Sequence, residues 1–251
     1  RRDDSARTRR KILISAQVEA LLARADIVLV SGGNTLFAVD RWRRFGLDEE
    51  LRKAAARGCV LTGGSAGAIC WFDAGHSDSA DPDSYADAML AGGSAAASTQ
   101  GASGSDAKPW EYIRCGGLGV LPGLCCPHHD RTQSNGVLRA VDFDGMLRRH
   151  NGETGVCIDH FAALVVDGAD YSILSLEGKP GTALADRDAP DFTGAGTPWV
   201  WIKRVEGDAV VATRLEPRGR LADALTPATA IVEDPRVEAA RAANPSDVDR
   251  P

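Results

Sequence analysis

The sequence predicts an α/β fold with a mostly parallel sheet flanked by helices, on three observations. Residues 27–30 are a continuous apolar run that is too short for a helix and ends near two glycines, as a buried parallel strand does. Residues 59–62 form a second such run, which is followed directly by two glycines. Helical patterns fill the chain between these runs, and strands that alternate with helices through glycine turns are typical of α/β folds.

The remaining elements follow in order along the chain. Apolar residues at helical spacing predict helices over 12–24, 36–44 and 48–57, and Gly58 ends the third. Beyond residue 117, an apolar stretch leads through Pro127 into two histidines, which we expect at a strand end. The elements expected after it are a helix over 137–149, strands over 162–166 and 171–176, a hairpin of 199–205 with 210–215, and a helix over 235–243.

Composition excludes several classes of function. The 29 Lys and Arg residues are outnumbered by 35 Asp and Glu, so we expect no surface for nucleic acid or an anionic membrane. The sequence has no apolar run of membrane-spanning length and no signal-peptide pattern. Its six cysteines form no CxxC pair, so we expect reduced thiols in a cytoplasmic protein without a metal or cofactor. One α/β domain over 1–251 is expected, with a flexible insert near 92–105, where Ala, Gly and Ser dominate.

The pattern Gly63-x-Ser65-x-Gly67, between an expected strand and an expected helix, indicates a nucleophile elbow. Its glycines permit a tight, crowded turn that lifts the Ser65 hydroxyl into the open. The backbone N–H of Ala66, at the start of the following helix, would then face a developing oxyanion. The turn therefore predicts a serine nucleophile.

A serine nucleophile needs a histidine base that a third group orients. Of the five histidines, His128 and His129 follow the apolar stretch and should lie near the edge of the sheet that carries the glycine turns. Asp159 and Asp130 are the acids that could orient the base.

Three segments carry a resemblance to a known family. Ser-Gly-Gly-Asn-Thr at 31–35, Gly-Ser-Ala-Gly-Ala at 64–68 and Cys-Pro-His at 126–128 resemble, in this order, motifs of the peptidase E and cyanophycinase family of serine peptidases. The resemblance implies a class I glutamine amidotransferase-like fold, a flavodoxin-like three-layer arrangement with the nucleophile on an elbow. It also implies a serine exopeptidase for short peptides, similar to dipeptidase E, with Asp-X peptides as candidate substrates and a second copy of the chain as a candidate partner.

The resemblance assigns roles to particular residues. Ser65 is then the nucleophile, His128 the general base, and the backbone N–H groups of Gly33 and Ala66 the oxyanion hole. Three further residues would line the substrate site: Asn34, Asp78 and Arg131. An arginine in this region meets the aspartate of the substrate in aspartyl dipeptidases, a pairing that suits the fork geometry of guanidinium.

Two departures from the family pattern bear on these roles. The position after Asp159, where the family usually has an acid, holds His160. Because adjacent residues of an extended segment point to opposite faces, the family register would turn His160 toward His128. We expect a local shift of one residue that makes Asp159 the third member, with His160 as the alternative. Second, only 30 residues precede Ser31, so we expect the family's additional N-terminal strands to be missing or the sheet to be smaller.

Two other readings stay open. A catalytically silent homologue could act as a binding or regulatory subunit, which His160 and the short N-terminal part favour. An α/β-hydrolase esterase shares the Gly-x-Ser-x-Gly pattern, but its order of Ser, Asp, His would require His160 as base and Asp142 or Asp144 as acid.

Overall fold

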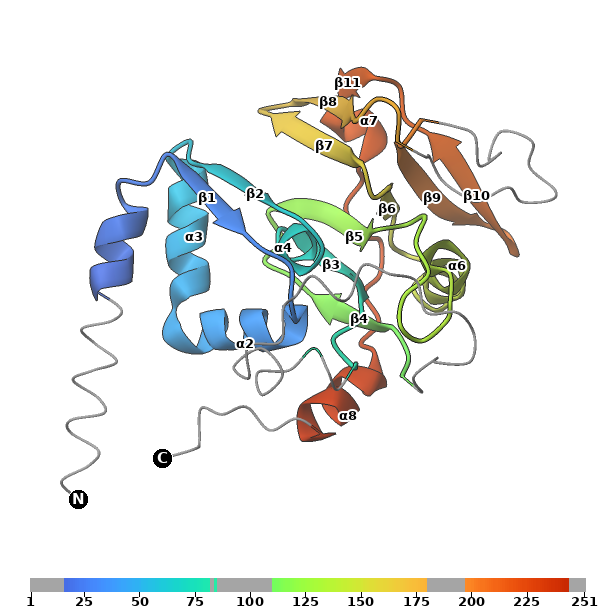
Figure 1. The fold of residues 1–251 in the computed structure, drawn as a ribbon, viewed down its shortest axis with the longest axis horizontal. Coiled ribbons are helices and arrows are strands. Elements are labelled where there is room, and N and C mark those ends of the chain that lie inside the picture. Colours follow the sequence, from blue (N-terminus) through green and yellow to red (C-terminus); the bar gives the residue numbers. More distant parts are fainter. Residues whose placement is uncertain (1–15, 82–83, 85–109, 180–196, 244–251) are drawn as a thin grey trace.

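The computed structural model describes residues 16–81, 84, 110–179 and 197–243, and the insert expected near 92–105 lies outside them (Figure 1). Within these ranges the expected helices and strands are largely confirmed. Residues 16–22 are helical, within the helix expected over 12–24, and the labelled helices are α2 (Thr35–Phe45), α3 (Leu47–Ala56), α4 (Ala66–Ile69), α6 (Arg139–Arg149), α7 (Leu221–Ala224) and α8 (Pro235–Ala243). The strands are β1 (Ile27–Val30), β2 (Val60–Gly63), β3 (Phe72–Ser77), β4 (Ile113–Gly116), β5 (Leu121–Pro127), β6 (Gly155–Ile158), β7 (Ala162–Asp167), β8 (Asp170–Ser175), β9 (Val200–Glu206), β10 (Ala209–Arg214) and β11 (Arg218–Arg220).

The strands form a mixed sheet rather than the mostly parallel one that the sequence predicted. Six strands pair in the order β10-β9-β6-β5-β3-β4, and only the β3–β5 and β5–β6 pairs are parallel. A separate parallel pair joins β1 to β2, and β11, β8 and β7 form a third, antiparallel sheet. The expectation failed because the hairpin of β9 and β10, which was itself expected, pairs antiparallel with β6 and extends the same sheet, and because β4 pairs antiparallel with β3 at the other edge.

The six-stranded sheet is covered on both faces (Figure 1). Alternate residues of β5 divide between two cores, because successive side chains of a strand point to opposite faces. Leu124 and Cys126 pack with Phe143 of α6 on one face, whereas Cys125 packs with Ile69 of α4 on the other. Helix α4 also contacts β1 and β2, so it joins the small parallel pair to the larger sheet. No helix in the described part of the chain combines the length and apolar character that a membrane crossing requires.

Two glycines bring the turn after β2 against the end of β1. A Cβ on Gly67 would lie 2.0 Å from the carbonyl oxygen of Val30, and one on Gly63 would lie 2.4 Å from the same oxygen. Real side chains do not approach a backbone oxygen so closely, so both positions require glycine. The neighbouring Gly64 has no atom within 4 Å of its missing Cβ.

This packing predicts different costs for two alanine substitutions. Gly67→Ala forces β1 and α4 apart and should lower the free energy of unfolding by about 3 kcal/mol, the upper range for overpacking. Gly64→Ala adds a methyl group in open space and should change it by no more than about 1 kcal/mol. Urea denaturation of both variants measures the contrast, and equal losses would contradict the close contact.

Candidate functional site

Ser65 lies in a strained turn between β2 and α4. Its backbone has φ 58° and ψ −124°, a combination that residues other than glycine rarely adopt. A Cβ on Gly32, in the first glycine turn, would lie 3.2 Å from the Cβ of Ser65. The two glycine turns that the sequence singled out therefore meet at Ser65, beyond the carboxyl ends of β1 and β2.

Asn34, expected to line the substrate site, uses its amide within the protein. Its side-chain oxygen caps α2 by accepting from the backbone N–H of Phe37 at 2.9 Å. Its amide nitrogen donates to the carbonyl of Ser79 at 3.1 Å and to the hydroxyl of Ser84 at 2.8 Å. Asn34 thereby ties the first glycine turn to the segment that follows β3.

The two histidines after β5 point in different directions. Pro127 and Ile158, the last residues of β5 and β6, are register partners in a parallel pair, so the residues that follow them lie side by side. The Nδ1 atom of His128 lies 2.8 Å from the Nδ1 atom of His160, and His128 has a positive φ of 50°. Both imidazoles are half-buried.

Asp159, expected as the third catalytic member, lies away from His128. One carboxylate oxygen is 3.3 Å from Nδ1 of the buried His129, and the other accepts from the backbone N–H of Trp199 at 2.9 Å and Nε1 of Trp201 at 3.2 Å. The expected shift of one residue is therefore absent. The alternation of an extended backbone turns His160 to His128 and buries Asp159 against His129.

Charge and burial keep His128 unprotonated. Burial, the nearby guanidinium of Arg139, His160 and the guanidinium of Arg131 together lower the pKa of His128 to about 3. Burial and Arg131 also lower the pKa of His160, which the carboxylate of Asp130 partly opposes. At neutral pH both imidazoles are therefore neutral.

Arg139 is a site residue that the sequence analysis missed. It is fully buried at the start of α6, donates from Nη2 to the carbonyl of His76 at 2.7 Å, and lies 5.0 Å from the ring centre of Tyr112. Although burial opposes it, the charge of Asp78 raises the pKa of Arg139. Within the described residues, the Arg139 Nη1 atom and the Tyr112 hydroxyl have no hydrogen-bond partner. From the sequence alone, Arg139 is predicted only to be a polar residue near the start of an amphipathic helix.

Arg131 lies on the outer side of this region. Its Nε atom is 3.9 Å from a carboxylate oxygen of Asp130, and its guanidinium lies 5.4 Å from the ring centre of Phe161. With 38% of its side chain exposed, it remains accessible to a ligand.

The acids required by the esterase reading are engaged elsewhere. Asp142 lies 2.8 Å from Nε2 of His76, and Asp144 lies 2.6 Å from Nζ of Lys203. His160, the base in that reading, contacts His128 instead. The structure does not bring together a triad of His160 with either acid.

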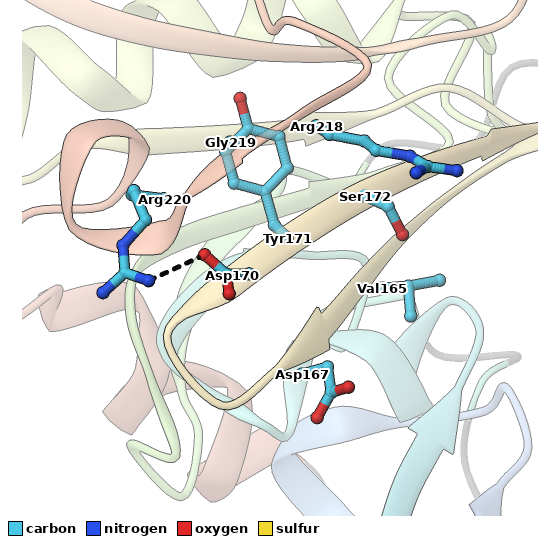
Figure 2. Close-up of a pocket in the computed structure, with 8 residues that line it drawn as sticks. All are labelled: Val165, Asp167, Asp170, Tyr171, Ser172, Arg218, Gly219 and Arg220. Atoms are coloured by element: carbon cyan, nitrogen blue, oxygen red, sulfur yellow. Dashed lines mark hydrogen bonds and ion pairs between the residues drawn. The ribbon is translucent and has the colours of Figure 1, made fainter.

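Neither a metal cluster nor the groove described next coincides with these residues in the described part of the chain. Over 16–81, 84, 110–179 and 197–243, no three His, Cys, Asp or Glu side chains are grouped to hold a metal ion. A groove of about 480 Å³ lies on the β7–β8–β11 sheet, where Arg220 pairs with Asp170 at 3.0 Å (Figure 2). None of the residues that the sequence predicted for chemistry lines this groove. Its lining consists of Val165, Asp167, Asp170, Tyr171, Ser172, Arg218, Gly219 and Arg220.

Comparisons with known proteins give a peptidase family and two relatives with different names. The sequence model of peptidase family S51 matches residues 11–174. An "Uncharacterized peptidase YgaJ" of Bacillus subtilis (strain 168) is 44% identical over 116 residues, which cover 46% of this chain and 38% of that protein. A Trypanosoma brucei brucei protein named "G2/mitotic-specific cyclin-1" is 31% identical over 228 residues, 90% of this chain and 64% of that protein. The chain thus spans less than two thirds of the length of these relatives.

The contacts of Asp159 predict a structural role for its charge. In Asp159→Asn the side chain loses its negative charge and keeps one acceptor oxygen instead of two, so the free energy of unfolding should fall by about 1–3 kcal/mol. Asp167→Asn, at the exposed end of β7, is the matched control and should change it by less than about 0.5 kcal/mol. Urea denaturation measures both, and an Asp159→Asn variant as stable as its control would contradict the buried contacts.

Proposed function

We propose that this chain, which belongs to peptidase family S51, is a serine peptidase that hydrolyses short peptides. One observation carries the serine mechanism. In the described part of the chain, Ser65 and His128 are the two non-glycine residues with positive φ. Strained backbone of this kind clusters at active sites, where the surrounding structure holds it. The strain at Ser65 supports a nucleophile elbow, and the strain at His128 supports the general base.

The proposed reaction follows from the chemistry of these two side chains. His128 takes the proton of the Ser65 hydroxyl on Nε2 while Oγ attacks the carbonyl carbon of the peptide bond. The same proton then passes to the leaving amine as the C–N bond breaks. Water next attacks the acyl-enzyme while His128 accepts a water proton, and His128 returns this proton to Ser65 Oγ as the ester bond breaks. Because burial and nearby cations lower the pKa of His128 to about 3, the imidazole is unprotonated at neutral pH, but it accepts the serine proton less readily than a base with a pKa near 7 would.

The oxyanion of this reaction needs donors that are already in place. We assign this role to the backbone N–H groups of Gly33 and Ala66. Ala66 is the first residue of α4, where helix N–H groups lack intrahelical partners. The close contact of Gly32 with Ser65 supports the presence of Gly33 beside the nucleophile.

An acidic substrate suits the charges around His128. The guanidinium groups of Arg131 and Arg139 both lower its pKa, so both lie close enough to influence a ligand at this site. Arg139 has an unpartnered buried nitrogen within the described part of the chain, and Asp78 lies near it. A carboxylate of the substrate would complete this arrangement, which favours peptides with an N-terminal aspartyl residue.

A silent homologue is the second candidate, and one observation favours it. His128 contacts a second histidine where a carboxylate would serve, and a neutral partner stabilises an imidazolium less than a carboxylate does. Binding of peptides without turnover would support this candidate over the first.

The first test of the peptidase is to remove the nucleophile. Ser65→Ala should lower kcat on dipeptides at least about a thousandfold. Ser65→Gly should be equally inactive but more stable than Ser65→Ala by about 1 kcal/mol, because glycine relieves the positive φ. Dipeptide hydrolysis and urea denaturation measure the two effects. Unchanged hydrolysis by Ser65→Ala would exclude the assigned nucleophile.

The second test addresses substrate charge. Arg131→Leu should reduce kcat/KM for Asp-Leu by about tenfold or more, and for Ala-Leu far less, since a charge-assisted pair contributes about 1.5–3 kcal/mol. Arg148→Leu, which replaces an exposed arginine in the last turn of α6, is the matched control and should leave both rates unchanged. Equal losses on the two peptides with Arg131→Leu would leave this residue a structural role only.

A further inference from the structure

The contact between His128 and His160 admits only certain placements of protons. Their Nδ1 atoms are 2.8 Å apart, and the two ring centres are 4.9 Å apart with the planes inclined by 37°. A hydrogen bond of this length needs one N–H donor and one lone pair. One imidazole must therefore carry its proton on Nδ1 and the other must leave its Nδ1 free.

The proposed peptidase mechanism decides which ring donates, and the inference rests on it. To take the serine proton on Nε2, neutral His128 must have that nitrogen free and hold its own proton on Nδ1. Then His160 must accept on Nδ1 and hold its proton on Nε2. We propose that neutral His160 is the positioning residue that fixes this tautomer of His128, in the role that a carboxylate fills in a serine triad.

His160 is held in place from both sides. Its backbone N–H donates to Oδ1 of the buried Asp130 at 2.8 Å. The ring of Phe161 meets the His160 ring edge-on, with centres 4.5 Å apart. On the opposite face of the same two segments, the buried pair of His129 and Asp159 fixes the register that brings His160 to His128.

Charges near the pair favour its neutral form. Arg139 of α6 and Arg131 of the segment after β5 are cationic neighbours of His128, and Arg131 also acts on His160. Asp130 is the carboxylate that acts on His160, and Lys179 lies 5.3 Å from the ring centre of the adjacent Phe161. Burial and the cations lower the pKa of both histidines and outweigh Asp130. The base therefore stays unprotonated at pH values where an isolated histidine, with a pKa of about 6.5, would gain a proton.

The tautomers can be read directly, whether or not the chain hydrolyses a peptide. In ¹⁵N-labelled full-length protein at pH 8, NMR of the imidazole nitrogens should show a proton on Nδ1 of His128 and on Nε2 of His160. His160→Phe, which removes the acceptor, should return His128 to a mixture of tautomers. A proton on Nε2 of His128 in the unsubstituted protein would overturn the inference. Absence of hydrolysis together with the expected tautomers would reject the proposed function and leave the inference intact.

Kinetics give the second measurement. In His160→Glu a carboxylate faces His128, so its pKa should rise and the acid limb of kcat/KM should move up by at least one pH unit. His160→Phe should lower kcat at least tenfold at every pH. Ala163→Glu, which adds the same charge at an exposed position of β7, should leave the profile unchanged. An acid limb that is the same in His160→Glu as in the unsubstituted protein would overturn the inference.

Discussion

The candidate site depends on the close approach between the turn after β2 and the carbonyl oxygen of Val30. This contact exists because Gly63 and Gly67 have no side chains, since a Cβ on either would lie within 2.4 Å of that oxygen. It holds α4 against β1, and α4 in turn packs through Ile69 on the six-stranded sheet. The position of Ser65 relative to the large sheet is thus set by the separation of backbones, which no rotation of a side chain can adjust.

A second constraint is the two-residue period of extended backbone. Parallel strands β5 and β6 end in register, and each is followed by two polar residues. One residue of each pair faces inward, where His129 meets Asp159, and one faces the site, where His128 meets His160. The inward pair makes the outward pair obligatory, because moving Asp159 to His128 would bury His160 against His129. The sequence therefore retains an acid at this strand end but uses it as a buried structural group.

The sequence predicted the local elements of this fold better than their pairing. Helices such as α2 and α6 were expected from apolar spacing, which is a property of short segments. Strand β3 was not expected, because Asp73, Gly75 and His76 interrupt its apolar pattern while the surrounding sheet buries it. The hairpin of β9 and β10 was expected, but its antiparallel pairing with β6 and the antiparallel edge strand β4 were not, since sheet order depends on contacts between distant segments. At the site, the glycine pattern indicated Ser65, but one residue of register decided between Asp159 and His160. No local pattern distinguishes Arg139 from a surface arginine.

Backbone strain links stability to the chemistry of the site. A non-glycine residue at positive φ costs about 1–3 kcal/mol, and Ser65 and His128 are the described residues that carry this cost. Each strained residue adjoins buried neighbours: Ser65 is followed by the buried Ala66 and Gly67, and His128 lies between the buried Pro127 and His129. These buried neighbours hold the two strained conformations in place. Selection for stability alone would therefore favour glycine at position 65. A serine at this position therefore costs stability, and what it provides is the hydroxyl group that the proposed reaction uses.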